Sequence, residues 1–413
     1  MPVRDFPVRP DLEQLRHQAK DLLRALRRSA PEALALVREH APRLDPAAAK
    51  LADAQHALAR SYGLASWPRL VLACRMTDAL WRDDLAAVEA LLDAHPELLV
   101  EGARGVRDSW GPPLSYAANL GRERLVVRLL ERGAGDLQHA FERACLQGQL
   151  ATARRLRAQG ARLERGLVMG PCETLNADGL AFLLELGAEP CDAHGDRLAP
   201  VALVLQTYSR RPEGKHRCLE LLERAGTPLP DTAPMAVHRG CLARLERHLA
   251  RDPGLLARTF THAEIYPPEL GCAADESLAL HGTPLAGGTL LHLCVDLDEL
   301  ELARALLAHG ADPDARAALD ADGFGGHTPL FGCVVSQPWR VGQRRDDAFA
   351  RLLLAAGADP SARASLRKRL RFVADETEHV YRDVTPRTWG ERFHDQAWVA
   401  RPVLELLAAR GAE

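Results

Sequence analysis

The chain has 413 residues, a formal net charge of −3 and 47% hydrophobic residues, but only 5% aromatic residues. Its core must therefore consist mainly of leucine, alanine and valine, which favours helices packed on helices. The small net charge excludes a general electrostatic attraction to nucleic acid or to an anionic membrane. The nine cysteines include no Cys-x-x-Cys pair, so they indicate neither a disulfide framework nor a cysteine-based zinc site.

Targeting and membrane signals are absent from the sequence. Residues 1–15 lack the apolar core of a signal peptide, and no later stretch approaches eighteen uninterrupted apolar residues. The 53 basic residues include few lysines, which is typical of coding bias in a high-GC bacterium. We therefore expect a bacterial protein of the reducing cytoplasm, with free cysteines and no membrane segment.

Residues 1–75 are predicted to form a small helical bundle. Within residues 11–26, leucines and an alanine recur on one face of a helix that starts at Asp11. Further helices are expected over residues 31–40 and 46–61. The opposite face of the first helix is basic and carries Arg16, Lys20, Arg24, Arg27 and Arg28. Since no aromatic residues interleave with these charges, the pattern is more typical of a solvated face than of a nucleic-acid site, which is the alternative.

A different pattern repeats along the rest of the chain. Gly-Ala pairs directly follow leucine-rich helical segments, at positions where glycine can adopt the left-handed conformation that ends a helix. These pairs are Gly133-Ala134, Gly160-Ala161, Gly187-Ala188, Gly310-Ala311, Gly357-Ala358 and Gly411-Ala412. Two further segments, 91–99 and 248–256, end in x-Pro-x-Leu-Leu.

A second signal opens the repeated segments, and residues 287–316 contain both signals, from "GGTLLHLCV" to the Gly-Ala-Asp ending. A similar opening, "GGHTPLFGCV", occupies residues 325–334. There Thr328 can cap a helix, Pro329 fits its first turn and Leu330 begins the buried face. Together these signals resemble the ankyrin repeat, a turn followed by two antiparallel helices, about 33 residues long, which stacks into a solenoid.

The resemblance implies an all-α fold, an α-solenoid of about nine degenerate helix-pair repeats. Residues 1–75 would form an N-terminal helical cap, residues 76–256 a first set of degenerate repeats, and residues 257–413 a second set with long insertions. It also implies that His292 forms hydrogen bonds between adjacent turns. The predicted function is that of a scaffold for protein–protein recognition, with another protein as its partner and no cofactor.

Three insertions interrupt the second set, at residues 257–288, 336–347 and 361–386. The resemblance implies that the lengthened turns at 257–288, 313–328 and 361–386 stand on neighbouring repeats and border one groove. Trp, Tyr and Arg residues often dominate binding energy. The predicted binding residues are Trp339, Arg340, Arg344, Arg345, Glu378, His379, Tyr381, Arg382, Trp389, Arg392 and His394. The alternative is that the aromatic residues seal the exposed end of the last repeat.

An alternative function is an enzyme, or a protein that binds a small molecule or metal in a pocket formed by the C-terminal insertions. If residues 261–264 were extended, His262 and Glu264 would lie on the same side and could contribute to a metal site with a histidine from another insertion. The acid/base or metal candidates are His262, Glu264, His379 and Asp395. No Gly-x-Ser-x-Gly motif is present, and nothing designates a nucleophile.

Overall fold

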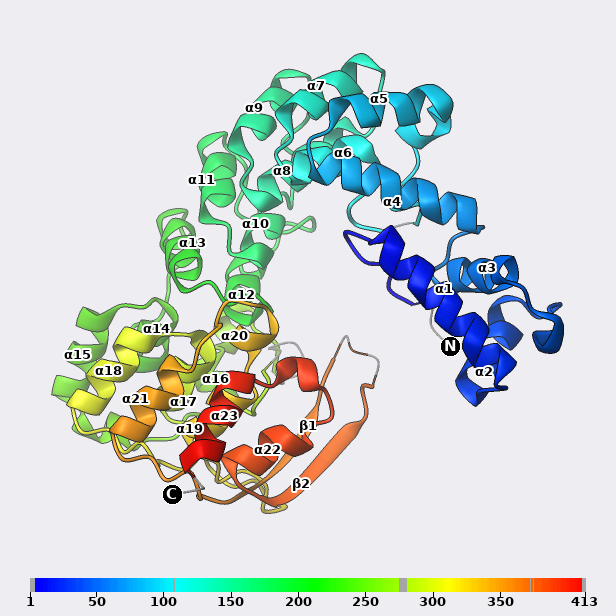
Figure 1. Cartoon of the computed structure of the whole chain (residues 1–413). Helices are drawn as coiled ribbons and strands as arrows, with labels where there is room; N and C mark the ends of the chain where they lie inside the picture. The colour runs from blue at the N-terminus through cyan, green and yellow to red at the C-terminus, as the bar shows by residue number, and fades with distance from the viewer. Residues whose placement is uncertain (1–3, 107, 275–280, 372, 374, 411–413) are drawn as a thin grey trace. The chain divides into compact units, whose positions relative to one another are not determined.

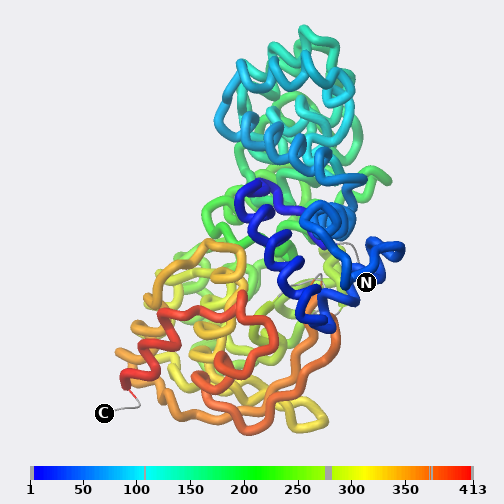
Figure 2. The backbone as a smooth tube through the Cα atoms, turned by 45° about the vertical axis from the view of Figure 1, so that its right-hand side comes forward, coloured from blue at the N-terminus to red at the C-terminus, as the bar shows by residue number. Residues whose placement is uncertain are grey.

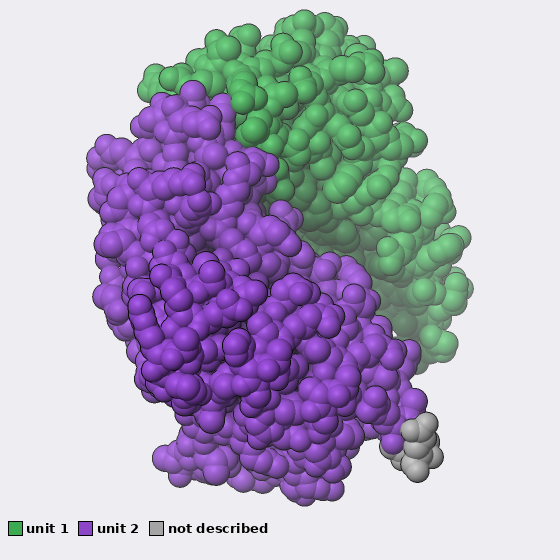
Figure 3. Space-filling model, turned by 90° about the vertical axis from the view of Figure 1, so that its left-hand side faces the viewer, with its two compact units in different colours: residues 1–162 green, residues 163–413 purple. Residues whose placement is uncertain are grey.

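The computed structural model describes residues 4–106, 108–274, 281–371, 373 and 375–410. These residues form helices throughout and a single two-stranded sheet (Figure 1). The chain divides into two compact units, residues 1–162 and 163–413, which Figure 3 colours separately. Figure 2 traces the successive helix pairs along the backbone. The predicted all-α repeat solenoid is confirmed.

The first unit begins with helices α1 (Leu12–Arg27), α2 (Pro31–His40) and α3 (Leu51–Ser61). The Asp11 side chain accepts hydrogen bonds from the first turn of α1, as the sequence predicted. The α2 prediction is also confirmed, whereas the expected third helix is interrupted because Pro46–Ala48 form a 3-10 turn and Ala49 is extended. All five basic residues of the α1 face are exposed.

Three helix pairs complete the first unit. They are α4 (Trp67–Trp81) with α5 (Leu85–Ala94), α6 (Pro113–Asn119) with α7 (Glu123–Glu131), and α8 (Leu137–Gln147) with α9 (Leu150–Ala158). A short 3-10 helix, Pro96–Leu99, follows α5. The domain boundaries predicted from the sequence, after residues 75 and 256, stay predictions.

Six further pairs form the second unit. They are α10 (Met169–Thr174) with α11 (Ala177–Glu185), α12 (Ala199–Gln206) with α13 (Pro212–Arg224), α14 (Ala233–His238) with α15 (Leu242–Arg251), α17 (Leu290–Leu297) with α18 (Leu300–Ala308), α19 (Pro329–Val334) with α21 (Ala348–Ala355), and α22 (Pro386–Arg392) with α23 (Arg401–Arg410). The insertions contain α16 (His262–Ile265) and α20 (Gln337–Arg340), and 3-10 helices lie at Pro253–Leu256, Pro268–Leu270 and Gln396–Trp398. First helices stack in series, with α14 on α17, α17 on α19 and α19 on α22.

The two local signals of the repeat act largely as predicted. Gly310 has a φ of 90°, which lets the amide of Ala311 reach back to the carbonyl of Leu306 and end α18. The last such ending, at residues 411–412, lies outside the described residues. At α19, Pro329 and Leu330 are placed as expected, but the side chain of Thr328 accepts no capping bond, so that part of the prediction is wrong.

His292 has the predicted role between adjacent turns. Its Nδ1 accepts a hydrogen bond from the Thr289 amide at 3.1 Å, and its Nε2–H donates to the His327 carbonyl, also at 3.1 Å. Burial lowers the pKa of His292 to about 3, so the ring is neutral and can accept and donate at the same time.

The insertion at 361–386 forms a β-hairpin, where the sequence indicated only a lengthened turn. Strand β1 (Ala364–Arg369) pairs with the antiparallel strand β2 (Glu378–Val384). Burial alternates along β1, with Ala364, Leu366 and Lys368 buried, which is the period of two expected of a strand. The hairpin and α22 position most of the candidate residues.

Candidate functional site

The three lengthened turns, which we call fingers, are joined by backbone hydrogen bonds. Within finger 257–288 the Gly287 amide donates to the Phe260 carbonyl at 2.7 Å, and the Ala318 amide of the next finger donates to the Gly287 carbonyl at 2.8 Å. The Gly325 amide then donates to the Ser365 carbonyl at 2.7 Å. Fingers 257–288, 313–328 and 361–386 therefore lie side by side, as the sequence predicted.

A pocket of about 450 Å³ opens between the fingers. Each finger contributes to its wall, and the main lining side chains are Phe260, His262, Leu319, Phe324, Leu366 and Arg367. The lining is mixed, with apolar groups beside the Arg367 guanidinium, the Asp320 carboxylate and the imidazoles of His262 and His327. Such a pocket can accept an apolar side chain and provide a few polar contacts around it.

The rim of the pocket is partly apolar and exposed. Leu319 is 66% exposed, and Val380, which pairs with Arg367 in the sheet, is 49% exposed. Two guanidiniums lie close to the Phe324 ring, with that of Arg367 5.1 Å and that of Arg382 4.7 Å from its centroid. We call the pocket with Leu319, Phe324, Val380, Arg367 and Arg382 the finger surface. Arginine next to exposed apolar side chains is typical of protein-binding surfaces.

The predicted binding residues are only partly surface residues. Those that are exposed are Arg340, Arg345, Glu378, Arg382 and Arg392. Those of intermediate exposure are Trp339, His379 and His394, and those that are buried are Arg344, Tyr381 and Trp389. None of the predicted binding residues lines the pocket itself. Arg382 belongs to the finger surface because its guanidinium lies over the ring of Phe324, which does line the pocket.

Trp389 fits the alternative that the aromatic residues seal the last repeat, because it is fully buried. Its ring packs 4.7 Å from Tyr381 and 4.9 Å from Phe393, measured between centroids. Its indole N–H donates to Thr283 Oγ1 at 3.1 Å. Trp389 and Tyr381 thus seal the last repeat against the hairpin, and Arg344 is used inside as well, since it donates to the Val295 carbonyl.

His379 and His394 come together on the inner side of the hairpin. Their rings stack with centroids 3.9 Å apart and planes 5° apart. The Tyr381 hydroxyl donates to His394 Nδ1 at 2.7 Å, and His379 Nε2–H donates to Asp375 Oδ2 at 2.9 Å. Burial, together with His379, lowers the pKa of His394. Asp395 does not join this group, because its carboxylate caps the following 3-10 helix.

The extended conformation expected for residues 261–264 is wrong. Thr261 and Glu264 form a capping box that starts the short helix α16, and Glu264 also forms an ion pair with Arg258. His262 Nε2–H donates to the Ala273 carbonyl at 2.9 Å, away from Glu264. Among the described residues, no group of three His, Cys, Asp or Glu side chains could hold a metal ion.

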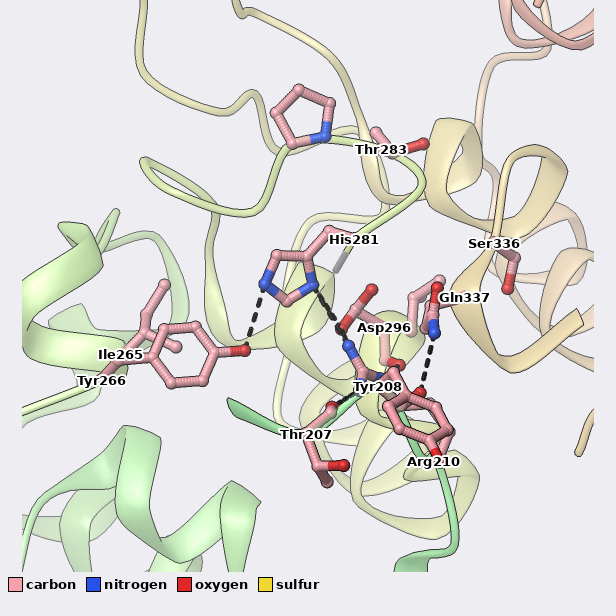
Figure 4. A network of polar contacts seen from close by, with 12 residues as sticks. Thr207, Tyr208, Arg210, Ile265, Tyr266, His281, Thr283, Asp296, Ser336 and Gln337 are labelled. Carbon is pink, nitrogen blue, oxygen red and sulfur yellow. Dashed lines mark hydrogen bonds and ion pairs between the residues drawn. The ribbon is translucent and has the colours of Figure 1, made fainter. Parts of the chain in front are cut away.

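A buried polar network lies elsewhere in the second unit, and sequence reasoning missed it (Figure 4). The Asp296 carboxylate in α17 accepts from His281 Nδ1–H at 2.8 Å and from the Arg210 guanidinium at 3.2 Å. The Tyr266 hydroxyl donates to His281 Nε2 at 3.1 Å. The network ties the insertion that carries Tyr266 and His281 to α17, through Asp296, and to the loop between α12 and α13, through Arg210. Its role is therefore structural.

A buried lysine lies next to this network. Lys215 Nζ donates to His238 Nδ1 at 2.8 Å, and His238 Nε2–H donates to the Ile265 carbonyl at 2.9 Å. Burial, reinforced by the charge of Arg210, lowers the pKa of Lys215 to about 7. No local pattern distinguishes Lys215 from a surface lysine, so the sequence carries no signal for it.

Lys215 predicts a pH dependence of stability. Between the folded pKa of about 7 and the unfolded lysine pKa of about 10, the unfolded chain holds a proton that the folded chain releases, so stability rises with pH by up to about 1.4 kcal/mol per unit. We expect Lys215→Met to remove this rise, measured by urea unfolding at several pH values. Equal slopes for the two proteins would show that Lys215 keeps its ordinary pKa in the fold.

Comparison with known proteins finds a family match for one unit of the chain. Residues 286–318, which include α17 and α18, match the family model of the ankyrin repeat. Among solved structures, the human ASB11 ankyrin repeat domain is similar at 17% identity and a TM-score of 0.25, covering 72% of this chain and 97% of that chain. The sequence matches no curated protein. No described helix has the length and apolar character needed to cross a membrane. Helix pairs stack on both sides of the matched unit, and the chain is an all-α repeat solenoid in which this unit is similar to the ankyrin repeat.

Proposed function

We propose that the protein is a scaffold that binds another protein through the concave face of its repeats, with the finger surface as the contact site. Recognition of proteins is a general role of ankyrin repeats, and it is the role that the matched unit supports. The observation that carries the proposal is the pocket shared by three fingers, with Leu319 exposed at its rim. The same proposal includes a bacterial origin, a cytoplasmic location and a role for α1 to α3 as a cap on the first repeat.

The chemistry of the finger surface indicates how a partner would bind. An apolar side chain of the partner would enter the pocket and cover Leu319 and Phe324. Complete burial of a leucine side chain is worth about 1.5–3 kcal/mol, which corresponds to roughly tenfold or more in affinity. Arg367 is held by the Asp320 carboxylate at 2.7 Å, so it orders the pocket wall and does not supply a free charge.

The test is capture of partners from a lysate of the native host. We expect Leu319→Asp to lose a protein that the unchanged chain retains, because a carboxylate at the rim resists burial against an apolar partner. Val100→Asp is the matched control, since Val100 is 67% exposed and lies in the first unit. The proposal fails if Leu319→Asp and Val100→Asp capture the same proteins in the same amounts as the unchanged chain.

A further inference from the structure

The backbone ladder that joins the fingers ends at β2. Strand β1 has a neighbour on each side, with β2 along one edge and the Gly325 amide bonded to Ser365 on the other. Strand β2 pairs with β1 alone, and in the described part of the chain no third strand continues the sheet (Figure 1). The outer edge of β2 is therefore free to pair with another strand.

The two faces of β2 differ in character. His379 and Tyr381 face inward, where Tyr381 packs on Trp389. Alternate residues on the other face are exposed, and they are Glu378, Val380 and Arg382. Among the described residues, neither Glu378 nor Arg382 forms an ion pair. Val380 thus lies between two opposite charges that have no ion-pair partner among the described residues, although the Arg382 guanidinium also lies over the Phe324 ring.

We propose that two copies of the chain associate through their β2 edges as antiparallel strands, with Val380 on the two-fold axis. Val380 then lies opposite Val380 of the second copy, and Glu378 lies opposite Arg382 of the second copy. By symmetry, Arg382 lies opposite Glu378 of the second copy. One strand therefore supplies both halves of two ion pairs, as a two-fold interface requires.

The strand itself selects this register. Asp383 has a φ of 49°, and the pairing between β1 and β2 shifts at this end, so the regular edge ends just after Arg382. A shift that sets Val380 opposite Arg382 would remove both ion pairs. The paired edge is short compared with the roughly 20–30 residues per side of a standard interface, so the dimer is weak and depends on concentration.

Sedimentation velocity of the full chain, from low micromolar to several hundred micromolar, tests the proposal. The sedimentation coefficient should rise toward that of a dimer. Glu378→Arg sets like charges opposite each other twice and should weaken association at least tenfold. Glu378→Arg/Arg382→Glu restores opposite charges and should restore association. Glu391→Arg, at an exposed site on α22, is the control and should leave association unchanged.

Two results would overturn the proposal. One is a chain that stays monomeric at every concentration. The other is a double variant that associates no better than Glu378→Arg. Leu319→Asp should leave self-association unchanged, so this test and the partner-capture test can fail independently. Circular dichroism of each variant checks that the exposed substitutions leave the fold intact.

Cross-linking tests the register directly. Opposite residues of antiparallel strands have Cα atoms about 4.5–5.5 Å apart, within the range of a disulfide. With oxidised glutathione, Val380→Cys should form a dimer on a non-reducing gel as two thiols are oxidised and the glutathione disulfide is reduced to two thiols. Val100→Cys, at a site that is even more exposed, should give little dimer. Equal yields from the two variants would contradict the register.

The native cysteines leave this experiment interpretable. All are free, and all but Cys241 are buried. Burial raises the pKa of Cys218, Cys272 and Cys333, among others, to about 12, which keeps these thiols protonated and slow to react. The unchanged chain, treated in the same way, measures any contribution from Cys241.

Discussion

Asp296→Ala is expected to lower the free energy of unfolding by about 3–5 kcal/mol, the usual cost of breaking a buried ion pair by removing one partner. The carboxylate accepts from Arg210 and His281, and the Arg210 side chain is only 4% exposed. Without Asp296, the guanidinium would keep its charge in a site with little water. Urea unfolding followed by circular dichroism measures the loss.

The pH dependence of this loss follows from the pKa of Asp296. Burial opposes ionisation of Asp296, but His281 and Arg210 outweigh it and hold the pKa well below its usual range. A carboxylate with a lowered pKa stabilises the fold above its unfolded pKa of about 4 and loses that contribution as the pH falls through its folded pKa. The difference between the two proteins should therefore be full at pH 7 and shrink in acid.

Two variants test whether the loss of stability comes from the buried ion pair or would follow any substitution in the second unit. Asp178→Ala removes an exposed ion pair with Arg217 in the same unit and should cost less than about 1 kcal/mol. Arg210→Met/Asp296→Leu replaces the charged pair with apolar groups and should recover part of the loss. If Asp296→Ala costs no more than Asp178→Ala, the network contributes little to stability.

The parts of the fold that the sequence predicted correctly depend on short-range rules. The end of α18 at Gly310 requires only a left-handed residue after a helix, and the Asp11 cap requires only a side-chain oxygen before one. The His292 bonds follow from a repeat that places the same turn next to its neighbour. Each rule acts over a few residues or one repeat, so the sequence shows it directly.

The sequence did not predict the hairpin, because a charged residue at an inward-facing position interrupts the alternation of apolar and polar residues in β1. In β1 the residues Leu366 and Lys368 both face inward, and Lys368 is buried even though its type indicates a surface position. The alternation of apolar and polar residues that marks a half-buried strand is therefore broken.

The candidate site was predicted at the level of segments and less well at the level of residues. The three fingers meet as expected, but Leu319 and Phe324, which line the pocket, were not among the predicted residues. Residue type alone favoured Trp389, although a tryptophan can serve a core as well as an interface. Likewise Arg210 and Asp296 are 86 positions apart, and no spacing rule connects them.

Trp389→Ala is expected to lower the free energy of unfolding by about 3–5 kcal/mol, because it leaves a large cavity and removes the hydrogen bond that Thr283 Oγ1 accepts from the indole. Hydrogen exchange should show the loss mainly in β2, since Tyr381 packs on the missing ring. Trp339→Ala is the control, as Trp339 is only partly buried and should cost much less.

The same substitution separates support of the finger surface from contact with a partner. Trp389 has no exposed atoms to offer a partner, so any loss of partner capture in Trp389→Ala must arise through a disordered hairpin. Leu319→Asp should abolish capture with β2 still protected from exchange. If Trp389→Ala unfolds no more easily than Trp339→Ala, the tryptophan does not hold the hairpin, and the inner face of β2 must be stabilised by its histidine and tyrosine contacts alone.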